Sequence, residues 1–220
     1  MSGVRCPDYL TWPGSLIYKP CDAQKGGEEM KKLFIFAVAV LFVVTCTGGG
    51  FAGDMEVLGV KFPGEKVVNG KTLTLNGVAY LKKFFVKVYA VGLYLEKPTT
   101  DGEAVIESEQ MKQMYTHYLT DMATAKKLRE GFVELMEENN PPELITKHKA
   151  DIEAYVSWFD KDMAPGKTSV TTYVPGKGLI LEWQGEVKGT MPGSEFAQMY
   201  FRYQVGDKAD KKLRKGLLGA

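Results

Sequence analysis

Cysteine is scarce in this sequence. Its three copies, Cys6, Cys21 and Cys46, all lie near the N-terminus, and none follows residue 46. The rest of the chain therefore has no thiol that could form a disulfide, act as a nucleophile or bind zinc. Its stability has to come from a packed hydrophobic core, for which the remaining length is sufficient.

An excess of charge of one sign is also missing. Lys and Arg together number 28 and Asp and Glu 27, so the formal net charge is +1. Proteins that bind nucleic acid usually carry a basic excess, so we expect no nucleic-acid partner. Aromatic residues make up 11% of the chain, which is too many for a disordered protein.

The sequence motifs of several enzyme classes are absent as well. After residue 53 the chain has no GxGxxG, P-loop, GxSxG or HExxH sequence, so nucleotide-binding, hydrolase and zinc-protease chemistries have no support. Histidine is limited to His117 and His148, which fall on separate predicted elements. We therefore expect neither a metal site nor an acid–base pair from them, and no cofactor.

A cleaved export signal is predicted at residues 30–52. Met30-Lys31-Lys32 is a short basic start, an apolar run from Leu33 to Thr45 follows, and small residues come next at Gly48-Gly49-Gly50. This order is typical of a secretory signal peptide. The apolar run is shorter than the roughly 20 residues that a membrane-spanning helix needs. A signal peptide is therefore favoured over a membrane anchor, and we expect a periplasmic or secreted protein with no membrane span after cleavage.

Two alternatives concern the same region. Cys46 would be the lipidated residue of a lipoprotein, but Val43-Val44-Thr45 matches such a signal poorly. Residues 1–29 are rich in turn formers and have no apolar period, and residues 25–29 are what a purine-rich ribosome-binding site would spell in translation. We interpret residues 1–29 as a mis-assigned upstream extension or a disordered segment, with Met30 as the true start.

Residues 53–220 are predicted to form one domain, because no repeat or long linker interrupts them. Strand-like segments come first, one at residues 55–62 and one at residues 72–75, and two Asn-Gly pairs, Asn69-Gly70 and Asn76-Gly77, indicate turns. Further strands are predicted at residues 111–119, 169–174, 178–183 and 186–191. Because the strands do not alternate with helices, the pattern predicts an α+β fold with an antiparallel sheet.

The most informative stretch runs from Lys83 to Leu95. It is dense in aromatic and β-branched residues without a break, and both of its alternating faces are largely apolar. This predicts one central strand that is covered on both sides. Lys87 is the exception, because a charge in such a strand has to reach water, a partner or a ligand.

Four helices are predicted from apolar residues at helical spacing. Their ranges are 123–138, with Thr120 or Asp121 as N-cap, 142–159, 194–204 and 210–218. The acidic residues Glu134, Glu137 and Glu138 are interpreted as a solvated helix face.

Two segments resemble a known family. The first is LNGVA at residues 75–79 followed by KKFFVKVYAVGLYL at residues 82–95, and the second is GEVKGTMPGSEF at residues 185–196. The first looks like the signature region of chalcone isomerases and their bacterial relatives, and the second like the bacterial branch. The resemblance implies an open-faced β-sandwich, in which helices are layered on one face of a large antiparallel sheet.

The resemblance also implies where functional residues would lie. Plant members close a chalcone into a flavanone with an arginine, a strand threonine, a tyrosine and asparagine on the next helix, and a late hydroxyl. Other members bind fatty acids, with the arginine and a tyrosine holding the carboxylate. The matching positions here are Leu81, Tyr89, Thr124, Gly131 and Ala197. None keeps the catalytic identity, and the isomerase reaction needs a cation near a developing oxyanion.

We therefore predict a ligand-binding rather than a catalytic site. Tyr89 and Lys87 are one strand repeat apart, and Lys82 lies beside the position of the family arginine. Together they would hold a carboxylate in an apolar cleft. Thr124 would line the same cleft or serve only the start of its helix.

Three functions remain open. The first is an exported, non-catalytic protein that binds a fatty acid or another small amphiphile. The second is a retained isomerase or lyase activity, which requires a cation and several hydroxyls to converge. The third is a protein interaction module, in which side chains fill the cleft.

Overall fold

The computed structural model describes residues 53–220. The proposed upstream extension (1–29), the proposed signal peptide (30–52) and all three cysteines lie outside the described residues. Among the described helices, none is long and apolar enough to cross a membrane.

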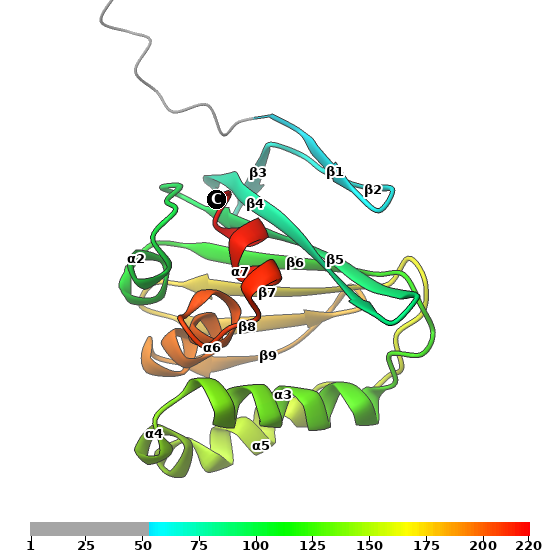
Figure 1. The fold of residues 1–220 in the computed structure, drawn as a ribbon. Coiled ribbons are helices and arrows are strands. Elements are labelled where there is room, and N and C mark those ends of the chain that lie inside the picture. Colours follow the sequence, from blue (N-terminus) through cyan, green and yellow to red (C-terminus); the bar gives the residue numbers. More distant parts are fainter. Residues whose placement is uncertain (1–52) are drawn as a thin grey trace, which may run out of the picture. The chain divides into compact units, whose positions relative to one another are not determined.

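A seven-stranded antiparallel sheet with strand order β3-β4-β5-β6-β7-β8-β9 forms the centre of the fold (Figure 1). The strands are β3 (Glu65–Val68), β4 (Lys71–Lys83), β5 (Val86–Leu95), β6 (Lys112–Tyr118), β7 (Thr168–Val174), β8 (Gly178–Trp183) and β9 (Glu186–Pro192). A separate two-stranded hairpin precedes them and consists of β1 (Met55–Val57) and β2 (Val60–Phe62).

The helices pack against one face of this sheet (Figure 1). They are α2 (Gly102–Glu107), α3 (Ala125–Asn139), α4 (Pro142–Lys147), α5 (Lys149–Ser157), α6 (Glu195–Val205) and α7 (Lys211–Leu217). The predicted α+β class and the open-faced sandwich are thus confirmed.

β5 is covered on both faces, as its sequence predicts. Val91, Leu93 and Leu95 belong to the larger core, between sheet and helices. Ala90 and Tyr94 belong to a smaller core on the other face, which includes Phe62 of β2. The Phe62 ring lies directly over Gly92, where an added Cβ would be 2.7 Å from it. The glycine thus makes room for the aromatic ring that closes this face.

The residue at which the central strand was predicted to begin is wrong. Instead of an unbroken strand from Lys83, the chain turns at Phe84-Phe85 and β5 begins at Val86, paired with Lys83. Phe84 adopts a positive φ of 53°. Aromatic residues favour strands locally, but here the pairing of β4 with β5 decides where the chain reverses.

Several other boundaries differ from the expectations. Residues 55–62 form the β1–β2 hairpin rather than one strand, and α2 was not anticipated. The helix expected at residues 142–159 is interrupted at His148, which lies between α4 and α5. The N-cap of α3 is Thr124 rather than Thr120 or Asp121.

A buried lysine on β6 binds the carbonyl groups at the C-terminal end of α2. Lys112 of β6 is 1% exposed, and its ammonium donates hydrogen bonds to the carbonyl oxygens of Val105, Ile106 and Ser108 at 2.7, 3.1 and 2.9 Å. The last carbonyls of a helix lack partners within the helix, and a cation there also complements the helix dipole. Burial lowers the pKa of Lys112 to about 8, although Glu109 opposes the shift. Its side chain therefore still donates to these carbonyls at neutral pH.

Asn76-Gly77 is not a turn but part of β4, whereas Asn69-Gly70 does connect β3 to β4 as predicted. The buried Asn76 side chain donates to the Leu217 carbonyl at 2.8 Å and accepts from the Thr99 amide at 2.7 Å. Gly77 lies against the end of α7, since an added Cβ would be 2.2 Å from the Gly216 carbonyl oxygen. This pair therefore fixes α7 on the sheet.

We expect Gly77→Ala to destabilise the fold. The new methyl group overlaps the backbone of α7, so the helix has to shift and loses packing, at a cost of about 2–3 kcal/mol. The control is Gly131→Ala in α3, where an added Cβ meets nothing within 4 Å. That change should stabilise the helix by roughly 0.5–1 kcal/mol. Urea unfolding measures both, and equal stability of the two variants would contradict the close approach of α7.

Candidate functional site

The residues predicted to form a clamp lie on β4 and β5 and differ in burial. Tyr89 is half-buried and packs against the core between sheet and helices. Lys82 and Lys87 are exposed, and they are opposite each other in the backbone pairing of β4 with β5, near the end of this hairpin. The Lys82 ammonium lies 5.1 Å from the centre of the Tyr80 ring. Leu81 is the cross-strand partner of Tyr89, so these two side chains lie on the same face of the sheet. The side chain of Tyr80, one residue earlier, points to the other face.

Thr124 caps α3. Its hydroxyl accepts a hydrogen bond from the Lys127 amide at 3.3 Å, which is the ordinary role of a threonine at this position. Its place in a ligand cleft stays a prediction, as do the binding roles of Tyr89, Lys82 and Lys87.

Tyr89 has neighbours that the sequence pattern did not single out. A group of five tyrosines lies between the sheet and the helices. We call it the tyrosine cluster, and it consists of Tyr89 on β5, Tyr118 on β6, Tyr155 on α5, and Tyr200 and Tyr203 on α6.

Aromatic contacts hold the tyrosine cluster together. The rings of Tyr89 and Tyr118 are 5.9 Å apart between centroids, those of Tyr155 and Tyr200 6.3 Å, and those of Tyr200 and Tyr203 5.1 Å. Phe132 of α3 packs on Tyr155 at 5.0 Å and on Tyr203 at 5.5 Å. Tyrosine from both layers thus brings hydroxyl groups into an apolar interior.

Burial governs the chemistry of these hydroxyls. It raises the pKa of Tyr89, and Tyr118, Tyr200 and Asp210 raise that pKa further. Burial likewise raises the pKa of the other four members of the cluster. All five phenols are therefore neutral at physiological pH and able to donate a hydrogen bond. The Tyr155 hydroxyl lies 3.1 Å from that of Thr171, so it has a partner on β7.

The edge of the cluster is partly open. Tyr118, Tyr155 and Tyr200 are buried at 5% exposure or less, whereas Tyr89 and Tyr203 are half-buried. The two half-buried members come from different layers, β5 and α6. Partial exposure in the cluster therefore occurs both on the sheet and on α6.

Three of the five positions that correspond to the family's functional residues, Leu81, Gly131 and Ala197, carry no polar side chain. Leu81 is the cross-strand partner of Tyr89, so a basic residue at this position would have stood beside it. Gly131 has open space where a side chain would begin, and Ala197 is buried. The hydroxyls of the tyrosine cluster thus converge without the family's cation.

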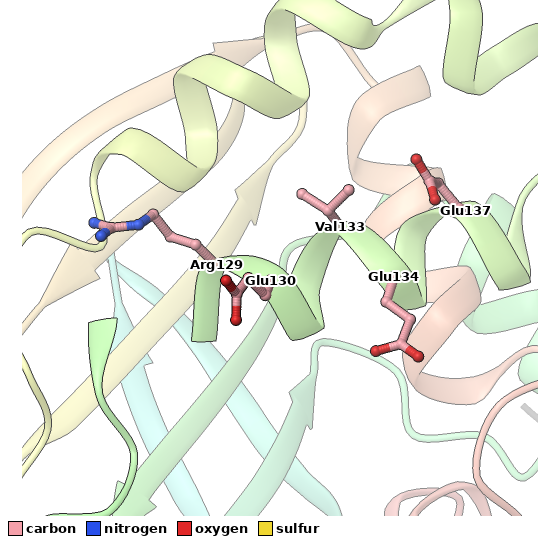
Figure 2. Close-up of a pocket in the computed structure, with 5 residues that line it drawn as sticks. All are labelled: Arg129, Glu130, Val133, Glu134 and Glu137. Atoms are coloured by element: carbon pink, nitrogen blue, oxygen red, sulfur yellow. The ribbon is translucent and has the colours of Figure 1, made fainter. Parts of the chain in front are cut away.

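A shallow pocket of about 430 Å³ lies elsewhere, on the outer side of α3 (Figure 2). Its lining comes from one helix: Arg129, Glu130, Val133, Glu134 and Glu137. Arg129 donates to the Phe159 carbonyl at 2.7 Å, which ties α3 to the end of α5. Glu134, Glu137 and Glu138 are exposed, as expected of a solvated face.

The two histidines lie on separate elements, His117 in β6 and His148 between α4 and α5. Within residues 53–220, no three His, Cys, Asp or Glu side chains are arranged to hold a metal ion. His148 instead joins two carboxylates, with its Nδ1 2.7 Å from Asp151 and its Nε2 2.6 Å from Glu195 of α6. Partial burial opposes protonation, but Glu195 and Asp151 outweigh it and raise the pKa of His148.

The stabilising effect of His148 should depend on pH. Because its pKa is raised on folding, its contribution is full below about pH 6.5 and is lost as the pH rises through the folded-state pKa. We expect His148→Gln to lower the unfolding midpoint by about 2–4 °C at acidic pH, and by less at alkaline pH. Calorimetry across that pH range measures the difference. A gap that widened toward alkaline pH would contradict the charged pairing.

Comparison with known proteins gives a matching family and structures with a similar fold. The family model described as chalcone isomerase-like matches residues 54–219. A crystal structure of a fatty-acid binding protein from Arabidopsis thaliana has a similar fold, with a TM-score of 0.61 over 75% of this chain and 95% of that chain. The two are 16% identical, which shows a shared fold alone. No curated protein sequence matches this chain.

Proposed function

Because the chain belongs to the chalcone isomerase-like family, we propose that it is a non-catalytic member that binds a fatty acid or a similar small amphiphile at the tyrosine cluster. Tyr89 is the residue that would touch the polar end of the ligand. The apolar tail would lie between the sheet and the helices.

The convergence of five tyrosines from both layers is the observation that carries this proposal. Burying so many hydroxyls is costly unless each has a partner, and within residues 53–220 no hydroxyl of the cluster is buried without one. A ligand head group would therefore bind at the half-buried residues Tyr89 and Tyr203, where it would exchange with water. The fatty-acid binding protein with a similar fold makes this ligand class the natural one to test first.

The charges around the cluster favour a neutral head group. Within residues 53–220, no hydrogen bond joins a Lys or Arg side chain to the hydroxyls of the cluster, and Asp210 contributes a negative charge near Tyr89. Neutral phenols in an apolar place stabilise a carboxylate less than a cation does. A fatty acid would therefore bind in its protonated form. Lys82 and Lys87, exposed at the end of the hairpin, would attract a free anion toward this side of the molecule rather than clamp it.

Export is the second part of the proposal. The basic start, the short apolar run and the small residues at residues 30–52 support a cleaved signal and a periplasmic or secreted protein. Identification of the mature N-terminus by mass spectrometry tests it. An intact N-terminus on protein recovered from cells would contradict cleavage.

We expect Tyr89→Phe to weaken binding of palmitate about 5- to 10-fold, the usual effect of one lost hydrogen bond. Tyr80→Phe is the matched control, because it removes the same hydroxyl from the opposite face and should leave binding unchanged. Isothermal titration calorimetry measures both. Native mass spectrometry of gently purified protein shows whether an amphiphile is already bound. An empty protein that also ignores added palmitate would refute the binding proposal.

Binding should also weaken as the pH rises. A fatty acid that binds as the neutral acid loses affinity above the carboxyl pKa of between about 4 and 5, by up to about tenfold per pH unit. Titrations from acidic to slightly alkaline pH, with a fatty alcohol as the non-titrating control, measure this. An affinity for palmitate that rises with pH would instead indicate a cation in the site.

Isomerase chemistry needs both hydroxyl groups and a cation near the developing oxyanion. The tyrosine cluster would supply the hydroxyls, but Leu81 occupies the position where the family arginine would supply the cation. A chalcone turnover assay separates the two functions. Turnover that falls in Tyr89→Phe would establish catalysis at this site. A protein that neither binds palmitate nor converts chalcone would point to an interaction role, with the aromatic rings serving only as core.

A further inference from the structure

The end of the β4–β5 hairpin extends beyond its neighbouring strands. β3 pairs with β4 only over Lys71–Thr74, and β6 pairs with β5 only from Tyr89 onward. The last rungs of the hairpin, Lys82 with Lys87 and Lys83 with Val86, therefore have no strand on either side. Figure 1 shows this end at the margin of the sheet. We call residues 82–87 the hairpin tip.

Two phenylalanines at the hairpin tip are fully exposed. Phe84 is 98% and Phe85 101% exposed, whereas Val67, the next most exposed large apolar residue within residues 53–220, is at 75%. Neither ring contributes to a core. Phe84 also adopts a positive φ, which Asn or Gly adopts far more readily than a bulky residue. Folding alone thus gives no reason for phenylalanine at either position.

The hairpin tip is also locally basic. Lys82, Lys83 and Lys87 surround the two rings and are exposed. No Asp or Glu occurs between Lys66 and Leu95, so nothing within either strand neutralises these charges. The next loop begins where the Leu119 amide donates to the Val88 carbonyl at 2.9 Å. Asp121 on this loop is acidic, and Lys126 and Lys127 in the first turn of α3 are basic. A chain with an overall net charge of +1 therefore concentrates positive charge around an apolar point.

We propose that the hairpin tip docks the protein on a lipid bilayer with anionic head groups. Aromatic rings at the end of a projecting hairpin reach the boundary between head groups and acyl chains, while lysines beside them contact phosphate. Basic residues next to such a surface add attraction to anionic lipids. The occupant is a bilayer rather than a protein, because two rings on a narrow convex tip cover far less than the roughly 800 Å² per partner of a stable protein interface. A bilayer can surround such a tip.

This inference stands apart from the proposed ligand. Tyr89 follows the hairpin tip on β5, so docking would bring the entrance of the tyrosine cluster close to lipid. Docking itself needs only the tip. A protein that binds vesicles but no fatty acid would leave the inference intact and remove only the proposed function.

The test uses the protein as isolated from expressing cells, with its N-terminus determined and identical in all variants. Binding is measured by flotation with vesicles of phosphatidylcholine containing phosphatidylglycerol, and with phosphatidylcholine alone. We expect Phe84→Ser with Phe85→Ser to weaken binding at least about tenfold. Val67→Ser with Val187→Ser is the matched control, because it removes exposed apolar side chains away from the tip. It should leave vesicle binding unchanged.

The charges are tested in the same way. Replacing Lys82, Lys83 and Lys87 by Gln should weaken binding to the anionic vesicles roughly 100-fold at low salt, and much less to phosphatidylcholine alone. Replacing the exposed Lys97, Lys177 and Lys208 by Gln changes the net charge equally and serves as control. An equal loss in both triple variants would overturn the assignment to the hairpin tip.

A reporter at the tip gives the decisive result, even if the apolar run at residues 33–45 also binds lipid. In the Phe85→Trp variant we expect a blue shift of the added tryptophan emission, and its quenching by brominated lipids, when anionic vesicles are present. Unchanged emission would overturn the proposal. Self-association of the lipid-free protein that disappears in the double serine variant would also overturn it, and would assign the tip to contact between protein copies.

Discussion

β5 is apolar on both of its faces, and each face has to be covered. The helices cover Val91, Leu93 and Leu95, and Phe62 of the β1–β2 hairpin covers the other side over Gly92. Within the sheet, β4 and β6 flank β5, so this strand is enclosed at its edges as well as on its faces. Burial of this strand therefore arranges the layers of the domain. It also defines the two regions of functional interest, because Tyr89 lies where β6 begins to cover β5 and the hairpin tip lies beyond that cover.

Polar groups inside the fold are few, and most have a structural purpose. Lys112 supplies donors to the end of α2, and Asn76 holds the end of α7 on β4. Both satisfy backbone groups that would otherwise lack partners, and such burial is costly unless each polar atom is paired. The tyrosine cluster differs from these, because its residues come from both the sheet and the helices and pack against the core between them rather than at helix ends. This difference is the structural basis for treating it as a site.

Loss of the family's cation changes what such a site can do. With Leu81 opposite Tyr89, no basic side chain within residues 53–220 hydrogen-bonds to these hydroxyls, and burial keeps the phenols neutral. Hydrogen-bond donation to a polar head group is chemistry that this arrangement retains. Stabilisation of a full negative charge, on a substrate or in a transition state, is the chemistry it weakens. The shared fold does not by itself give the chemistry at this site, which is why fold and function have to be argued separately.

The sequence by itself determined the fold class, most strands and helices, and the two-sided burial of β5, because each follows from the local spacing of apolar residues along the chain. It did not determine that Asn76-Gly77 lies within a strand or that Phe84-Phe85 forms a turn. Asn-Gly is a turn signal locally, but here its small glycine admits α7, whose Leu217 is 141 residues away. The tyrosine cluster likewise collects residues from β5, β6, α5 and α6. Such contacts depend on how distant segments pack, and no window of sequence contains them.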